Sequence, residues 1–185
     1  MPSAILEFIA HPPANSFLIV RESDSQFAIH NDEHEYQIIE HSLTDTDRSA
    51  MDCGYSISFL LSLNSSHPQN TKFGLIAFLD YRLNWLPLDF FNQAYERLES
   101  NASLILAFSP QSHDVSNKEN IKKLRYLTDL ALRCGFQLDE QQVLIKSNTY
   151  QTLTLSRSSR PPRWRIELFH EQELASFVDL FKESF

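Results

Sequence analysis

The chain has 185 residues and a formal net charge of −8, and 42% of its residues are hydrophobic while 22% are charged. This composition excludes a disordered or collagen-like chain, and the length suits about one domain with a sizeable core. The three glycines, Gly54, Gly74 and Gly135, lie too far apart for a dinucleotide-binding fingerprint or a phosphate-binding loop.

Membrane-spanning and disulfide-rich classes are also disfavoured. No apolar run approaches the ~20 residues of a membrane span, and the first residues lack the basic start and long apolar stretch of a signal peptide. The two cysteines, Cys53 and Cys134, are too few for a disulfide framework or a four-thiolate zinc site. We therefore expect a cytoplasmic protein without a membrane partner.

Acidic residues concentrate in the N-terminal third. Residues 1–54 contain ten acids against two bases, Arg21 and Arg48, whereas the rest of the chain is neutral overall. Because this region would repel phosphate, we expect no nucleic-acid partner.

The N-terminal region is predicted to be rich in short strands. Residues 17–20, 26–30 and 35–41 combine aromatic and β-branched residues with partial alternation, which predicts a small meander of strands. The polar residues 42–54 predict a loop or one short helix. We expect residues 1–54 to form an acidic, β-rich region.

Buried strands and amphipathic helices are predicted next. Residues 55–63 predict a strand, and residues 73–80 form a nearly continuous apolar run, typical of a strand covered on both faces. An amphipathic helix is predicted over 86–99, followed by a second buried strand over 102–110. The apolar face of this helix consists of Phe91, Ala94, Tyr95 and Leu98.

A second helix is predicted over residues 117–133, and Gly135 suits the left-handed position that closes it. Residues 136–147 and 149–157 predict two antiparallel strands around a short turn. The core side of the helix is expected to consist of Ile121, Leu124, Leu127, Thr128 and Ala131.

Buried strands separated by helices and followed by an antiparallel strand pair predict an α/β fold. We expect a partial Rossmann-like sheet over residues 55–157, with helices on both faces, a C-terminal antiparallel strand pair and the small N-terminal β meander before it. Residues 158–185 add a linker rich in Arg and Pro, a strand over 163–169 and an amphipathic helix. A homodimer through that helix is left open, because its apolar face suits a partner. That face consists of Leu174, Phe177, Val178, Phe181 and Phe185.

Four arginines cluster at the start of this last segment. A solvated basic run of this kind is common on protein surfaces. The alternative is a contact with an anion or phosphate, with Trp164 as a stacking surface. The cluster consists of Arg157, Arg160, Arg163 and Arg165.

The order and the amino-acid sequences of the central elements resemble those of a known family. KFGLIAFLDYRLNWLP and LDFFNQAYERLESNASLILAF are followed by KLRYLTDLALRCGFQLDEQQVLI and TYQTLTLSR. From about Ser56 to Arg157, the chain resembles the C-terminal half of a class I S-adenosylmethionine-dependent methyltransferase. These four runs are similar to that family's fourth strand with its loop, its next helix and fifth strand, its last helix, and its closing antiparallel strand pair.

The resemblance also implies a substrate site at the end of the fourth strand. There Asp80, Tyr81, Asn84 and Trp85 would face the crevice outside the carboxyl ends of the strands. The alternative is a structural role, as a strand-ending acid with an Asx-type turn and a core tryptophan. The family's glycine-rich cofactor loop is missing, since no glycine precedes Gly54. The cofactor is therefore unknown, and S-adenosylmethionine has no glycine-rich loop to support it.

The tail resembles a second family. WRIELFHEQELASFVDLFKESF is similar to the first strand and first helix of a GNAT acetyltransferase domain. This resemblance implies a chain that positions a substrate for a catalytic domain it does not itself contain.

A metal site is not expected. His30, His34 and His41 lie among acidic residues, but their spacing is not that of a metal-binding motif. A solvated acidic turn with incidental histidines explains them better.

The sequence leaves three functions open, and with them the question of whether the chain is an enzyme. The first is a methyltransferase-like domain without a standard cofactor loop, acting as a binding or regulatory module for a small molecule or a protein partner. The second is an active S-adenosylmethionine-dependent methyltransferase, either minimal or completed by a partner. The third is the N-terminal, substrate-positioning part of a GNAT acetyltransferase fusion.

Overall fold

The computed structural model describes residues 4–8, 12–22, 27–30, 35–53, 72–85, 89–108, 118–138, 143–146 and 151–158. The strands predicted over 55–63 and 163–169, the C-terminal helix, and Arg160, Arg163 and Arg165 lie outside these residues.

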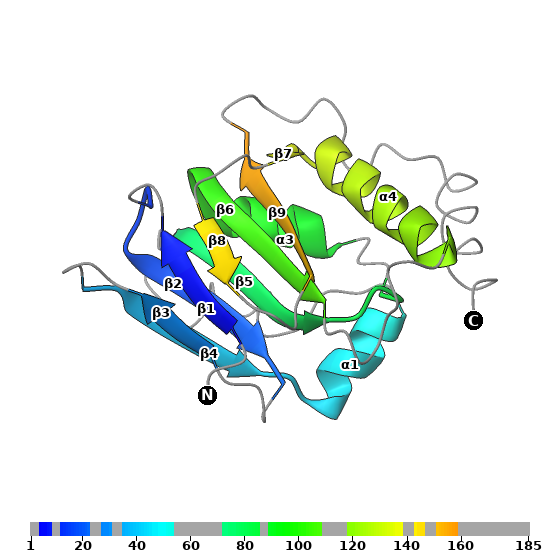
Figure 1. Cartoon of the computed structure of the whole chain (residues 1–185), viewed down its shortest axis with the longest axis horizontal. Coiled ribbons are helices and arrows are strands. Elements are labelled where there is room, and N and C mark those ends of the chain that lie inside the picture. The colour runs from blue at the N-terminus through cyan, green and yellow to red at the C-terminus, as the bar shows by residue number, and fades with distance from the viewer. Residues whose placement is uncertain are drawn as a thin grey trace.

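The fold is α/β, with a six-stranded mixed sheet at its centre (Figure 1). Its strand order is β4-β2-β5-β6-β9-β7. The first four strands are parallel to one another, and β9 is antiparallel to both β6 and β7. The strands are β2 (Ser16–Arg21), β4 (Gln37–Ser42), β5 (Phe73–Tyr81), β6 (Leu98–Phe108), β7 (Phe136–Leu138) and β9 (Gln151–Arg157).

A second, three-stranded sheet has the order β3-β1-β8. Its strands are β1 (Ala4–Phe8), β3 (Phe27–His30) and β8 (Val143–Lys146). In Figure 1, β1 and β8 cross in front of the main sheet, whereas α3 (Phe90–Arg97) lies behind it.

The alternation of buried residues shows that both faces of the main sheet are covered. Leu18, Val20 and Phe78 belong to one apolar cluster, and their neighbours Ile19 and Ala77 belong to another on the opposite face. This burial confirms the prediction that residues 73–80 form a strand covered on both faces, because every residue from Phe73 to Leu79 is buried.

The expectation of helices on both faces is wrong for the described part of the chain. Met51 of α1 (Asp45–Asp52), Phe91 of α3 and Leu127 of α4 (Lys118–Arg133) all join the same apolar cluster. The opposite cluster is instead covered by partly buried residues that include Phe27 and Ile29 of β3. A small sheet can replace helices there because it also offers an apolar face.

The predicted N-terminal meander is also wrong. β2 and β4 pair in parallel, with Phe17 opposite Ile38, and β3 belongs to the other sheet. A parallel pair needs a crossover, and β3 lies within that crossover. Because β2 also pairs with β5, the main sheet continues across the boundary expected between residues 1–54 and 55–157.

The C-terminal strand pair is confirmed in part. β7 and β9 are antiparallel, with Phe136 opposite Arg157. However, the single strand predicted over 136–147 is divided, since β8 leaves the main sheet and pairs with β1. The helix prediction holds well, because α4 ends at Arg133 and Gly135 has a φ of 104°.

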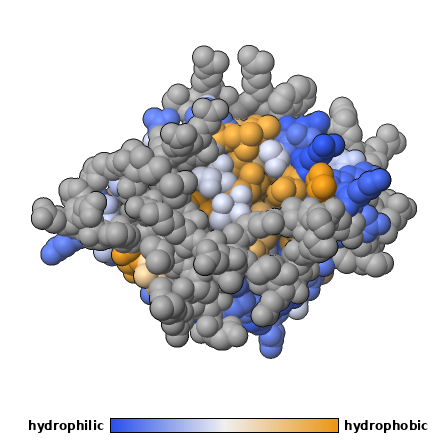
Figure 2. Space-filling model, viewed as in Figure 1, coloured by the Kyte–Doolittle hydropathy of each residue, from blue (hydrophilic) through white to orange (hydrophobic). Residues whose placement is uncertain are grey.

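None of the described helices is long and apolar enough to cross a membrane. Figure 2 shows apolar residues gathered in the upper middle of the face in view, next to hydrophilic ones. Large apolar side chains with substantial exposure among the described residues are Ile38, Ile121, Leu132 and Leu138. Ile121 was expected to face the core, but its side chain is exposed. Leu130, which was not among the residues expected on the core side of this helix, is buried.

Candidate functional site at the carboxyl edge of the sheet

The order of the parallel strands creates a switch point between β2 and β5. From β2 the chain moves to β4 on one side, and it later returns to β5 on the other side. In open α/β sheets, ligands bind in the crevice outside the carboxyl ends of the strands at such a point. The residues that follow β2 and β5 are therefore the candidate site.

Register brings two carboxylates together at this point. Val20 pairs with Phe78, so Glu22 and Asp80 lie across from each other just beyond the paired residues. The backbone N–H of Glu22 donates to Asp80 Oδ2 at 3.4 Å. Asp80 has a φ of 60°, a conformation that is uncommon for residues other than glycine and that clusters at functional sites.

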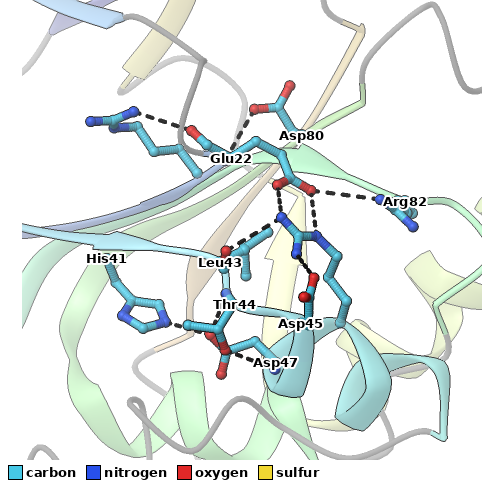
Figure 3. Close-up of polar contacts among 10 residues, drawn as sticks. Glu22, His41, Leu43, Thr44, Asp45, Asp47, Asp80 and Arg82 are labelled. Carbon is cyan, nitrogen blue, oxygen red and sulfur yellow. Dashed lines mark hydrogen bonds and ion pairs between the residues drawn. The ribbon is translucent and has the colours of Figure 1, made fainter.

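Arg48 of α1 binds the Glu22 carboxylate with two guanidinium nitrogens (Figure 3). The same guanidinium donates to Asp45 Oδ1 at 2.7 Å and to the Leu43 carbonyl oxygen at 3.4 Å. Arg82, just after β5, lies 3.7 Å from Glu22 Oε1. The Glu22 carboxylate raises the pKa of Arg48 above its ordinary value, so this arginine stays charged.

A capping box begins α1, and His41 of β4 joins it to the sheet. The Thr44 side chain accepts from the Asp47 backbone N–H, and Asp47 Oδ2 accepts from the Thr44 backbone N–H at 3.0 Å. His41 at the end of β4 adds a third contact, because its Nε2 lies 2.8 Å from Asp47 Oδ2. α1 therefore begins where β4 ends, which directs Arg48 toward Glu22.

The four predicted substrate-binding residues divide into two kinds. Tyr81 and Trp85 are fully buried in the apolar cluster beneath the helices, and burial raises the pKa of Tyr81 well above its ordinary value. Asp80 and Asn84 are half-buried. Asp80 and Asn84 are therefore partly accessible at this edge, whereas the two aromatic residues pack in the core beneath it.

Lys123 of α4 reaches the same loop. It is buried, and its Nζ donates to Asn84 Oδ1 at 3.4 Å. Burial lowers the pKa of Lys123, and Glu119 one turn earlier offsets part of this shift.

Arg157 of the predicted anion-binding cluster has a structural contact instead. Its Nη1 donates to the Tyr95 carbonyl oxygen at 3.0 Å and also to that of Leu98. Its guanidinium carbon lies 4.2 Å from the centre of the Tyr95 ring, within cation–π range.

Sequence reasoning missed most of the charged residues at the edge. Glu22, Arg48 and Arg82 are far apart in the chain, and only the pairing of β2 with β5 and the docking of α1 bring them together. Lys123 was missed as well, because the core side predicted for its helix did not include position 123.

The residues that follow β2 do not fit S-adenosylmethionine in the manner of the resembling family. That manner needs glycine where the backbone approaches the cofactor, and residues 17–30 contain none. Here the Glu22 N–H is bonded to Asp80 and the Glu22 side chain to Arg48. Among the described residues, no group of three or more His, Cys, Asp or Glu side chains is arranged to hold a metal ion.

Neutralising Glu22 tests the ion pair that joins α1 to this edge. We expect Glu22→Gln to lower the free energy of unfolding by about 1–2 kcal/mol, because both partners are largely shielded from water. The matched control is Glu40→Gln, whose exposed pair with Arg21 is expected to contribute under about 1 kcal/mol. Urea unfolding of both variants measures the difference, and equal effects would contradict a special role for Glu22.

Asp47 should make the stability of the protein sensitive to acid. Burial raises the pKa of Asp47, but hydrogen bonds from Thr44 and His41 outweigh it and lower the pKa below its ordinary 3.8. The unfolded chain then binds a proton more readily, so this stabilisation is present above about pH 4 and is lost as pH falls through the folded-state pKa.

We expect Asp47→Asn to have a lower free energy of unfolding than the native chain at neutral pH. This difference in free energy should become smaller below about pH 4. Urea unfolding across pH 2–7 provides the measurement. Asp129→Asn, at an exposed position of α4, is the control. A gap that stays constant with pH would contradict the assignment.

Comparisons with known proteins give little. No protein-family model matches the chain, and no curated protein matches it. One similar solved structure is named "Putative hemolysin from Streptococcus thermophilus", with 12% sequence identity and a TM-score of 0.38. The similarity covers 91% of this chain and 66% of the other, a little under two thirds of its length. A likeness at this level carries no argument.

Proposed function

We propose that this chain is a methyltransferase-like α/β domain that binds a small molecule or a protein partner at the carboxyl edge of its sheet and acts as a binding or regulatory module. One observation carries the proposal. At the β2–β5 switch point, where the fold class binds ligands, an ion-paired Glu22 and a strained Asp80 stand in place of a glycine-rich loop.

The sheet supports the methyltransferase-like part of the proposal. Four parallel strands with a switch point are followed by β9, which is antiparallel and lies between β6 and β7. This agrees with a family whose sheet closes with an antiparallel strand pair, as the resemblance of residues 56–157 implies.

The environment of the aromatic residues supports a role without catalysis. Tyr81 and Trp85, which the resemblance assigns to the substrate crevice, are fully buried. Arg82 lies over the Trp85 ring at 5.4 Å, and Trp85 Nε1 donates to Asp52 at 2.8 Å. These contacts hold the loop after β5 against α1.

Asp80 favours the alternative of an active methyltransferase completed by a partner. Backbone strain at the carboxyl end of a strand is a feature of catalytic sites, and Asp80 has it. The GNAT alternative rests on residues 163–185, which lie outside the described part of the chain.

Formation of S-adenosylhomocysteine from S-adenosylmethionine distinguishes these functions. The chain is incubated with the donor and pools of small-molecule or protein acceptors, with Asp80→Ala and Asp129→Ala as the matched variants. We expect no product above background with any of the three proteins. Product that forms with the native chain and with Asp129→Ala, but is lost in Asp80→Ala, would overturn the proposal in favour of the enzyme.

A further inference from the structure

Lys123 lies on the buried side of α4, where the other buried residues are apolar. The buried residues of this helix are Lys123, Leu127, Leu130 and Ala131, which lie on one side at spacings of three and four. Only 6% of Lys123 is exposed, and a lysine buried to this extent almost always has a polar partner, which here includes Asn84. Positions where a sequence breaks its local rule are expected to be functional or strained.

The lysine head group points to the edge that the proposed function uses. Its Nζ lies 3.4 Å from Asn84 Oδ1, in the turn that follows β5. The Trp85 backbone N–H closes this turn on the Arg82 carbonyl oxygen at 2.9 Å, and the Trp85 side chain fixes the turn against α1. Asn84 therefore stands in a rigid loop, and Lys123 approaches it from a helix.

The chemistry of the two side chains suits an anion. An ammonium group supplies three N–H donors, and an amide nitrogen supplies two, so both can donate to one carboxylate or phosphate group. Burial strengthens such contacts because water competes less for the donors. Glu119, one turn before Lys123, is exposed, and its carboxylate interacts with the Lys123 ammonium group without fully offsetting the effect of burial on the pKa of Lys123.

We infer that Lys123 and Asn84 form a subsite for the anionic group, a carboxylate or a phosphate, of a small molecule bound at the carboxyl edge of the sheet. This inference rests on the proposed function, since it names the ligand chemistry of the same edge. The carboxyl edge would then have two charged positions. Lys123 is the cationic position beside the loop after β5, and the carboxylates of Glu22 and Asp80 lie at the switch point.

Reaction with pyridoxal 5′-phosphate tests the subsite, because this probe carries a phosphate and an aldehyde. The Lys123 amine adds to the aldehyde and releases water to give an imine. Borohydride then delivers a hydride to the imine carbon, and solvent supplies the proton on nitrogen, which leaves a stable label. Peptide mass spectrometry of the native full chain compares Lys123 with Lys118 and Lys122, the exposed lysines of the same helix.

We expect Lys123 to be labelled before Lys118 and Lys122, because burial lowers the pKa of its amine and because the phosphate of the probe can bind beside Asn84. Inorganic phosphate or acetate should protect Lys123 and leave Lys122 unchanged, and the stronger competitor identifies the anion. Asn84→Asp should abolish this protection by like-charge repulsion. The inference would be overturned if the exposed Lys118 and Lys122 were labelled before Lys123. It would also be overturned if neither phosphate nor acetate reduced the labelling of Lys123.

This outcome is separate from the test of the proposed function. Product formation from S-adenosylmethionine would overturn the module but leave protection of Lys123 unaffected. Loss of protection without product formation would overturn only the subsite.

Discussion

Gly74→Ala is expected to lower the free energy of unfolding by about 3 kcal/mol, one of the two largest effects of any substitution proposed for this chain. Gly74 lies near the start of β5, which pairs with β2. A Cβ at this position would overlap the backbone carbonyl of Ala14, just before β2. Backbone atoms cannot rotate away as a flexible side chain can, so the two strands must separate.

The effect matters for function because β2 and β5 form the switch point. Urea unfolding and the circular dichroism of the folded state provide the measurement. Gly135→Ala is the control. Alanine at the φ of 104° of Gly135 should introduce strain of about 1 kcal/mol at the end of α4, away from the contact between β2 and β5. Native stability of Gly74→Ala would show that β2 and β5 do not approach as closely as described.

Trp85→Ala is expected to lower the free energy of unfolding by about 3–5 kcal/mol, because it removes a large buried ring from the core. The ring packs edge-to-face on Phe78 at 5.8 Å and on Tyr81 at 5.5 Å. It also donates to Asp52 at 2.8 Å, a bond that ties the loop after β5 to α1.

Two further variants separate structure from ligand binding at this loop. Trp85→Phe keeps most of the apolar volume but loses the donor, so it should cost less than the alanine variant. Asn84→Ala, at a half-buried position, should cost under about 1 kcal/mol in urea unfolding. If Trp85→Ala kept native stability, the structural role assigned to the ring would be wrong.

Local patterns predicted the elements of this fold well. The apolar run at residues 73–80 became β5, and part of the helix predicted over 86–99 became α3, with Phe91, Ala94 and Tyr95 buried. Leu98, which was expected on the apolar face of that helix, is instead the first residue of β6. Gly135 closes α4 as expected. These features depend on residues close together in the chain, which is why the sequence reveals them.

Pairing between distant strands could not be predicted. Residues 17–20 and 35–41 have the composition of strands in any sheet, and nothing local distinguishes a meander from the parallel pair they form. The division of 136–147 into β7 and β8 likewise depends on β1, more than a hundred residues earlier. The N-terminal region therefore joined the main sheet unexpectedly.

The candidate site was foreseen only at its β5 end. Asp80 and Asn84 end or follow an apolar strand, and that position alone marks the carboxyl edge of a parallel sheet. Their partners Glu22 and Lys123 come from β2 and α4, so the charge of the edge became apparent only in the fold.

Thermal unfolding with and without millimolar S-adenosylmethionine, S-adenosylhomocysteine and acetyl-CoA tests the central claim most directly. A ligand that binds the folded state raises its stability, by about 2.7 kcal/mol at a hundred times the dissociation constant. We predict one cooperative transition whose midpoint none of the three ligands moves, because residues 17–30 contain no glycine and the Glu22 side chain after β2 is ion-paired with Arg48. A midpoint that the adenosyl ligands raise in the native chain but not in Asp80→Ala would contradict the account, because it would show that the carboxyl edge of the sheet binds these ligands.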